Sequence, residues 1–330
     1  MSEKKRVAVL MGGANAEHDI SMLSGSMVVE HLPPDRYEAI PIHIAKDGSW
    51  YFRPPNGPPI SFADAMPALS ALSMDCVFIA LHGPFGEDGR IQAALDLLQI
   101  PYTGSGSGAS ALAIDKTRAK AVVSGAGIRV ARQIEIGGHD WDASRDGATG
   151  KIADIGFPCV VKSPCLGSSL GMAIVEDTAA LPGGVAVVRE HGDRIMVEQF
   201  VEGTELTCGV LDVGDGPVAL PVTEIRPKSD GYFDYDAKYT PGATDEITPA
   251  EIPGDVAEEV RDIAVRAHEI IGCRGFSRSD IFWTGDGLVW LEINTIPGLT
   301  QMSLFPKGAR AVGTSFPELL GLLVDAARWG

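Results

Sequence analysis

Short apolar runs alternate with amphipathic stretches in the first third of the chain. Residues 6–12 are predicted to form a buried strand, because a run of apolar side chains ends there in the glycine pair Gly12-Gly13. The pattern continues with a helix from about Glu17 to His31, strands at 37–44 and 75–81, and a helix from Gly89 to Gln99. This order predicts a parallel α/β unit that ends near residue 115.

The rest of the chain follows a different pattern. A helix over Ser107 to Ser124 is expected to lead into a strand-rich part from 128 to about 213, in which Phe157 to Lys162 is the clearest strand. Residues 226–248 are polar, interrupted by Gly and Pro, and contain several aromatic side chains, which is typical of a long functional loop. Helices are predicted from Pro253 to Ile271 and from Ser315 to Ala327.

A hairpin is predicted between these two helices. Apolar residues follow Asp280 and precede Glu292, and the segment Thr284 to Gly287 has the composition of a tight turn. Side chains alternate faces along a strand, so Arg278 shares a face with Asp280, as does Glu292 with Asn294. Folding at the turn brings Asp280 to within about one residue of Glu292 in register.

This hairpin offers carboxylate and amide oxygens beside a guanidinium. Oxygen ligands suit a hard cation, and few ligands with room for water and phosphate suit Mg²⁺ better than Ca²⁺ or Zn²⁺. The alternative is an ordinary solvated polar face. The apolar neighbours on both strands favour the metal site, because a wet face would otherwise interrupt a core-like hairpin.

Composition narrows the class of protein. A chain of 330 residues with 45% hydrophobic content is expected to form two or three structural units. A net charge of -17 argues against nucleic acid as a partner. The five cysteines have neither zinc-ligand nor disulfide spacing and are expected to be reduced. Neither a signal region nor a run of transmembrane length is recognised, so a cytoplasmic protein is expected, with no membrane partner.

Two glycine-rich segments invite a nucleotide interpretation. Lys162 ends an apolar strand before the loop Ser163 to Gly171, whose backbone N–H groups and hydroxyls would suit phosphate better than an ordinary hairpin turn would. Residues 104–109 match the dinucleotide fingerprint formally. That interpretation is rejected, because the segment ends the α/β unit instead of forming its first turn.

Several single residues have two interpretations each. Glu198 and Glu205 flank a strand end. They are either a pair of surface acids or ligands of adenine and ribose. Glu17 opens the first helix, either as a favourable charge at its N-terminus or as an anchor for a substrate ammonium. His82 precedes a glycine-rich turn and is a further candidate for the site, although a lone histidine is more often structural.

Taken in order, these features form a recognisable set. The motifs run Gly12-Gly13-x-x-x-Glu17-His18, His82-Gly83-x-x-Gly86-Glu87-Asp88-Gly89, Asp115-Lys116, Val161-Lys162 with Gly167-Ser168-Ser169, Phe233 to Tyr239, Arg278-x-Asp280, and Glu292-Ile293-Asn294 through Gly298 to Ser303-Leu304. The chain resembles the D-alanine–D-alanine ligases of the ATP-grasp superfamily along nearly its whole length. The resemblance implies ligation of two D-alanines through a D-alanyl phosphate, for peptidoglycan synthesis.

The resemblance also implies an architecture and partners. It implies an α/β fold of the ATP-grasp (α+β) kind, with an N-terminal parallel α/β unit over 1–115, a small central subdomain over 116–205 and a C-terminal domain over 206–330 that carries a lid loop at 226–248. ATP is the implied co-substrate, with two Mg²⁺ ions for which Mn²⁺ can substitute. The implied partners are D-alanine, ATP and a second copy of the chain in a homodimer.

Roles follow for individual residues. The resemblance places Lys116, Lys162, Ser169 and Lys238 at ATP, with Glu198 at adenine and Glu205 at the ribose. Asp280, Glu292 and Asn294 are the implied metal ligands. The implied catalytic set is Glu17 at the first ammonium with Ser168 and Tyr239, and Arg278 with the Gly298 backbone at the oxyanion. Ser303 and Leu304 would receive the second carboxylate.

Alternatives remain at this point. A relative that adds D-serine or D-lactate shares the same motifs, although the pair Lys238-Tyr239 resembles that of enzymes that add D-alanine. A nicotinamide-dependent oxidoreductase is a remote alternative, because the first turn, Gly12 to Glu17, lacks its fingerprint. A nucleotide-binding module without catalysis is a third, which the complete ligand set argues against.

Overall fold

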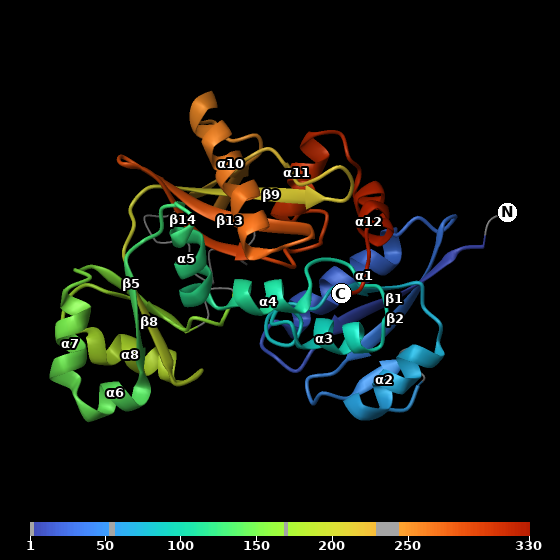
Figure 1. Ribbon diagram of the computed structural model, residues 1–330, viewed down its shortest axis with the longest axis horizontal. Helices are drawn as coiled ribbons and strands as arrows, with labels where there is room; N and C mark the ends of the chain where they lie inside the picture. Colours follow the sequence, from blue (N-terminus) through green and yellow to red (C-terminus); the bar gives the residue numbers. More distant parts are fainter. Residues whose placement is uncertain (1–2, 53–56, 168–170, 229–243) are drawn as a thin grey trace.

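The computed structural model describes residues 3–52, 57–167, 171–228 and 244–330. Its long axis runs from the N-terminal part, which Figure 1 draws in blue, to a small green lobe formed by the middle of the chain. The orange and red C-terminal part lies above and between them. Three sheets with helices packed against them give the α/β arrangement that the resemblance implies.

A sheet of three parallel strands with one antiparallel edge strand forms the centre of the N-terminal part. Its order is β3 (Trp50–Phe52), β2 (Tyr37–Ile44), β1 (Lys5–Gly12) and β4 (Cys76–Ile79), with β1 parallel to both β2 and β4. Helices α1 (His18–His31) and α3 (Arg90–Leu97) confirm the predicted alternation. Two elements were not predicted, the edge strand β3 and helix α2 (Phe62–Ala71), which contains Pro67 and is capped by Ser61.

The prediction of one helix over Ser107 to Ser124 is wrong. The structure has α4 (Ser107–Ile114) and α5 (Lys116–Gly125), separated by Asp115 in an extended conformation. The Asp115 side chain accepts a hydrogen bond from the Arg118 backbone N–H and so caps α5. The Lys116 N–H donates to the carbonyl of Pro164. The break therefore ties Lys116 to the glycine-rich loop.

A small antiparallel sheet forms the middle of the chain. Its order is β5 (Gln133–Gly137), β8 (Arg194–Gln199), β6 (Cys159–Lys162) and β7 (Met172–Val175). The prediction of a strand-rich part from 128 to about 213 was incomplete. Three helices also belong to it: α6 (Gly138–Ala143), α7 (Arg145–Ala153) and α8 (Leu181–Arg189). In α8 two glycines and three valines give a composition without helical preference, and packing of its buried face decides the conformation.

The third sheet carries the predicted hairpin. Its order is β12 (Thr244–Ile247), β11 (Thr223–Pro227), β9 (Thr204–Asp212), β13 (Gly275–Thr284) and β14 (Gly287–Asn294), with β10 (Val218–Ala219) paired to β9. Asp280 faces Glu292 directly and Thr284 faces Gly287, which confirms the predicted register and two-residue turn. The ends of the segment 226–248 are paired strands, and its residues 229–243 lie outside the described part of the chain.

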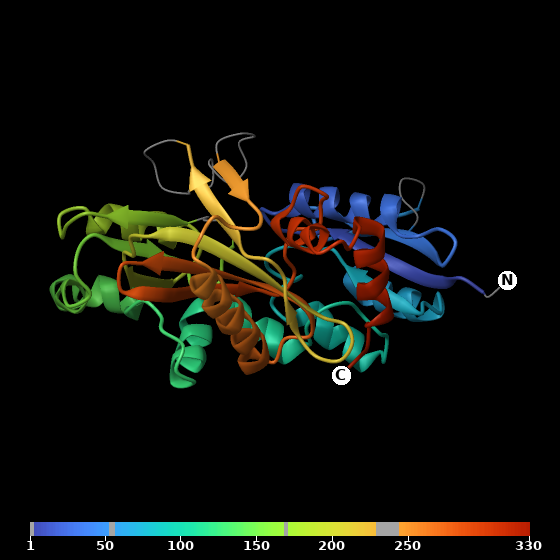
Figure 2. The same cartoon turned by 90° about the horizontal axis from the view of Figure 1, so that it is seen from above.

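Three helices complete the C-terminal part. The amphipathic helix α10 (Gly254–Ile271) packs on the third sheet, close to its predicted bounds, and α12 (Phe316–Asp325) confirms the predicted last helix. Helix α11 (Leu304–Ala311) was not predicted as a helix. Figure 2 shows the red helices α11 and α12 lying beside the blue N-terminal part.

Hydrophobic clusters divide the molecule into three cores. The first joins β1 and β4 to side chains from the C-terminal end, such as Phe305 and Leu319. The second joins α5 to α10 and the third sheet, and the third lies within 136–197. The division at residues 115 and 205 remains a proposal. The first two cores contain residues from before position 115 and from after position 205. Segments that are distant in the sequence therefore pack together in one core.

Candidate functional site

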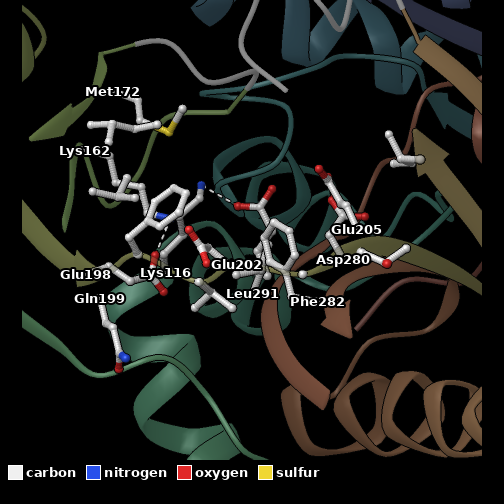
Figure 3. A pocket seen from close by; sticks show the side chains of 18 of the residues that line it. Lys116, Lys162, Met172, Glu198, Gln199, Glu202, Glu205, Asp280, Phe282 and Leu291 are labelled. Carbon is white, nitrogen blue, oxygen red and sulfur yellow. Dashed lines mark ion pairs between the residues drawn. The ribbon is translucent and has the colours of Figure 1, made fainter. Parts of the chain in front are cut away.

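Two adjoining cavities lie where the second and third sheets and the N-terminal unit meet. One measures about 760 Å³ and the other about 730 Å³, and residues including Lys116, Asp280 and Glu292 line both. Figure 3 shows the first cavity, with Lys162, Met172 and Glu198 on one side and Glu205 and Asp280 on the other. The two cavities therefore share one wall, the β13–β14 hairpin.

The hairpin side chains lie together as the sequence predicted. Arg278 donates from Nε and Nη2 to the two carboxylate oxygens of Asp280, both at 2.9 Å. Thr207 of β9 donates to Asp280 Oδ1 at 2.6 Å, and Asn294 donates to Oδ2 at 3.3 Å. A register shift between Asp280 and Ile281 interrupts the regular pairing, which resumes with Ile281 opposite Trp290. Three side chains thus converge on the Asp280 carboxylate at the junction of the cavities.

Neighbouring acids keep the Arg278 guanidinium charged. Burial alone would lower the pKa of Arg278, but the charge and hydrogen bonds of Asp280, with the charge of Glu292, outweigh it and raise that pKa. The guanidinium therefore stays protonated, although its surroundings are desolvated.

The donor set fits a hard divalent cation. Asp280 and Glu292 supply carboxylate oxygens and Asn294 an amide, on paired positions of one hairpin. In the described part of the chain, no group of three or more His, Cys, Asp or Glu side chains is arranged to hold a metal. Two carboxylates and an amide suit Mg²⁺, which keeps water or phosphate oxygens in its remaining positions.

Two predicted lysines reach the cavity from different elements. Lys116, at the start of α5, lies 3.2 Å from Glu292 and donates to the Leu166 carbonyl at 2.7 Å. Lys162, at the end of β6, pairs with Glu198 of β8 at 2.7 Å. The dashed lines in Figure 3 mark ion pairs of this cavity. Both ammonium groups therefore face the same space, next to the loop at Gly167.

A third lysine, which was not predicted, belongs to the same site. Lys120 lies one helical turn after Lys116, is fully buried, and forms an ion pair with the other carboxylate oxygen of Glu198. Burial lowers the pKa of Lys120, and the positive charge of Lys162 lowers it further. Glu198 thus bridges two ammonium groups. The spacing of Lys116 and Lys120 on one helix face was the available signal.

Part of the wall of the first cavity is apolar. Side chains from β6, β7, β13 and β14 line it, together with the segment after β8, and they include Val160, Met172, Ile174, Phe282 and Leu291. Glu205, at the start of β9, lies on the wall that both cavities share. A flat aromatic ring fits such apolar walls, with polar groups at the edges for orientation.

Glu17 enters the second cavity from the N-terminus of α1. Its side chain makes no capping hydrogen bond to the helix. A Cβ at Gly83 would collide with its carboxylate, so the glycine, with φ of +69°, permits the close approach. His82 precedes this glycine and is buried, with Nε2 2.8 Å from Ser24 Oγ and Nδ1 3.8 Å from Glu87 Oε1.

The far end of the second cavity is formed by residues that follow β14. Gly298, Ser303 and Leu304 line it. Ser303 Oγ accepts the Thr300 N–H at 3.1 Å and lies 2.8 Å from Thr300 Oγ1. A Cβ at Gly298 would lie 2.9 Å from Ser303 Oγ, closer than side chains tolerate. The segment therefore wraps tightly around the start of α11.

Four predicted residues cannot be placed. Ser168, Ser169, Lys238 and Tyr239 lie outside the described residues. The other predicted site residues line one or both of the adjoining cavities, from Glu17 at one end of the chain to Leu304 at the other.

Comparison with known proteins gives consistent matches over nearly the whole chain. The family model described as "D-ala D-ala ligase C-terminus" matches residues 122–325, and "D-ala D-ala ligase N-terminus" matches 6–68 and 56–105. The chain is 42% identical to a D-alanine–D-alanine ligase of Desulforudis audaxviator, over 98% of this chain and 99% of that protein.

Solved structures agree with the family match. The VanG D-Ala:D-Ser ligase of Enterococcus faecalis is similar with a TM-score of 0.84 and 31% identity, covering 98% of this chain and 99% of that one. A D-alanine–D-alanine ligase of Bacillus anthracis complexed with ATP is similar with a TM-score of 0.78 and 28% identity, covering 98% and 97%.

Proposed function

The chain belongs to the D-alanine–D-alanine ligase family, and we propose that its two adjoining cavities carry out the ATP-dependent ligation of two D-alanines for cell-wall synthesis. The observation that carries this proposal is the β13–β14 hairpin, which places Arg278, Asp280, Glu292 and Asn294 on the wall between the cavities. One cavity is assigned to the nucleotide and the other to the amino acids.

The first cavity suits ATP. Its apolar wall is assigned to adenine, with Glu198 at the edge of the base and Glu205 at the ribose. Lys116 and Lys162 are assigned to the phosphates, because their ammonium groups face the cavity beside the loop at Gly167. Asp280, Glu292 and Asn294 would hold two Mg²⁺ ions, which would neutralise charge that develops on the phosphates during transfer.

The second cavity suits two small amino acids. Glu17 is assigned to the ammonium of the first D-alanine, whose carboxylate then points towards the hairpin and the nucleotide. Phosphoryl transfer to that carboxylate gives an acyl phosphate, which makes the carbonyl carbon reactive towards an amine at neutral pH. His82 lines the same cavity as Glu17, and its ring contacts Ser24 and Glu87, so it is proposed to shape this end of the cavity.

Arg278 is assigned to the second step. Attack by the second amine produces a tetrahedral oxyanion, and phosphate leaves when it collapses to the amide. A guanidinium has five N–H donors, and Asp280 engages only the nitrogens Nε and Nη2. Nη1 and the Gly298 backbone N–H are the donors assigned to the oxyanion. Ser303 and Leu304 are assigned to the carboxylate of the second D-alanine.

A second acceptor remains a specific candidate. The solved ligase named for D-Ala and D-Ser has the same fold over the same length, so D-serine in place of the second D-alanine would fit this architecture. D-lactate is the third acceptor to compare. The relative at 42% identity is named for D-alanine at both positions, which supports D-alanine as the leading choice.

Incubation with ATP and Mg²⁺ tests the proposal directly. D-Alanine alone is expected to give phosphate release and a dipeptide detected by mass spectrometry. Parallel reactions with D-alanine plus D-serine or D-lactate give the acceptor preference from the product masses. No phosphate release with D-alanine alone would contradict the proposed function.

A homodimer and a cytoplasmic location are part of the same proposal. The described residues include no helix long and apolar enough to cross a membrane.

A further inference from the structure

A lysine and a glutamate without a role so far face each other at the second cavity. Lys307 of α11 forms an ion pair with Glu246 of the edge strand β12. Their side chains are 18% and 29% exposed, and both residues line the cavity. In Figure 2, β12 is the short orange arrow beside the yellow β11. The pair therefore joins the edge of the third sheet to the helix that begins at the second-substrate end.

Lys307 stands next to the residues assigned to the second carboxylate. Its backbone N–H donates to the Ser303 carbonyl at 3.0 Å, so it lies one helical turn after Ser303. Residues four apart share a face of a helix. The ammonium group is thus carried on the side of α11 from which Ser303 lines the cavity.

The other cations that line this cavity have different partners. Lys116 pairs with Glu292, and Arg278 pairs with Asp280. Both of those acids are assigned to metal, so an exchange of partners there would disturb the metal ligands. Glu246 has no such assignment. Of the lysines and arginines that the structure places on this cavity, Lys307 can change partner without affecting the hairpin.

We propose that Lys307 recognises the carboxylate of the second D-alanine, and that Glu246 holds the lysine until that carboxylate binds. The assignment rests on the proposed function and extends it to a residue that selects the acceptor. Glu246 and the substrate carboxylate compete for one ammonium group. Lys307 therefore favours an anionic acceptor, while the charge of Glu246 opposes it.

A second ion pair on β12 provides a matched control. Asp245 precedes Glu246 and pairs with Lys228 at 2.8 Å, with side chains 57% and 51% exposed. Side chains alternate faces along a strand, so this pair faces solvent and not the cavity. Replacing Lys228 by Gln removes a lysine–acid pair from the same strand without changing the charge of the cavity.

The experiment is a competition between two acceptors. The enzyme receives ATP, Mg²⁺, D-alanine and D-alaninamide, which has no carboxylate, and mass spectrometry gives the ratio of dipeptide to dipeptide amide. The ratio does not depend on how much of a variant is folded. In Lys307→Gln it is expected to fall about 10- to 100-fold, the range for losing a charge-assisted hydrogen bond.

The companion variants have distinct expectations. Glu246→Gln is expected to raise the ratio, Lys307→Arg to keep it within about threefold of wild type because the charge remains, and Lys228→Gln to leave it unchanged. An unchanged ratio in Lys307→Gln, or an equal fall in Lys307→Gln and Glu246→Gln, would overturn the proposal. If the wild-type enzyme makes no dipeptide, the proposed function fails instead.

Discussion

Charge pairing sets the properties of individual side chains around the cavities. Arg278 stays charged because Asp280 and Glu292 compensate its burial, whereas Lys120 has a lowered pKa because burial and Lys162 dominate. Two cations of one site, one partly and one fully buried, therefore have opposite shifts in pKa. The difference lies in the neighbours of each side chain and not in its residue type.

Removing Arg278 tests its assignment to the tetrahedral state. Arg278→Met is expected to lower kcat by about 10²–10³, the usual cost of losing an oxyanion donor. The KM for ATP should change little, since Thr207 and Asn294 still hold Asp280. Steady-state kinetics with ATP varied at saturating D-alanine measure both constants. A loss confined to KM would be incompatible with this role.

Removing Lys120 tests whether the buried pair with Glu198 supports the nucleotide cavity. Lys120→Met is expected to lower the free energy of unfolding by up to about 3 kcal/mol, which is the low end of the range for breaking a buried ion pair. The low end is expected because Lys162 still pairs with Glu198 in this variant. Urea unfolding measures the change. The exposed residue Lys151 supplies the control, with Lys151→Met expected within about 0.5 kcal/mol of wild type. Equal stability of the two variants would rule out a supporting role.

At the scale of elements, contacts between strands and helices decide where side chains point. Asp115 interrupts what the sequence presents as one helix, and its carboxylate also accepts hydrogen bonds from Arg194 of β8. The same arginine reaches Glu135 of β5. The break therefore links the start of α5, and with it Lys116, to the small sheet that carries Lys162.

The packing of α10 on β13 predicts a pH-dependent stability. His268 is buried, with Nδ1 2.7 Å from Ser277 Oγ and Nε2 3.7 Å from Asp212 Oδ2. Burial lowers the pKa of His268, an effect that Asp212 and Glu269 partly oppose. The unfolded chain then binds this proton more readily than the folded one. Stability is therefore retained above the unfolded pKa of about 6.5 and declines as the pH falls below it.

Thermal unfolding between about pH 8 and pH 5 checks this expectation, which rests on the unfolded pKa of histidine. His268→Gln is expected to reduce the dependence of Tm on pH relative to wild type. His139 has an exposed side chain, so His139→Gln is the matched control and should keep the wild-type slope. A slope in His268→Gln equal to that of wild type would show that His268 does not contribute.

At the scale of the molecule, the nucleotide cavity lies between two separately packed cores. Lys162 and Glu198 belong to the small antiparallel sheet, and Asp280 and Glu292 belong to the third sheet. A ligand that contacts both sides stabilises the arrangement of the two sheets as well as each sheet. Binding at this place therefore couples parts of the chain that otherwise pack independently.

Ligand-induced stabilisation measures that coupling. A nonhydrolysable ATP analogue with Mg²⁺ is expected to raise the free energy of unfolding by about 2.7 kcal/mol at 100 times its Kd. Hydrogen exchange should slow in β6 and β13 together. Lys162→Met should reduce the shift in Tm, whereas Lys151→Met should retain it. Protection limited to one of the two sheets would contradict a site between them.

The sequence by itself determined the elements whose evidence is local. Strand alternation and the turn at Gly285-Asp286 predicted the hairpin, its register and the meeting of Arg278, Asp280, Glu292 and Asn294. The order of the motifs predicted the family and the fold. These features depend on neighbours along the chain or on short pairings, which a pattern records directly.

Only the tertiary structure decided the features that depend on distant neighbours. The break at Asp115 depends on Pro164 and Arg194, and the burial of Lys120 depends on Glu198. The ion pair between Glu246 and Lys307 joins residues from two elements that no local pattern relates. In each case the energy of a charge depends on which side chains and how much water surround it. That environment is set by how the three cores pack and not by the residues adjacent in sequence.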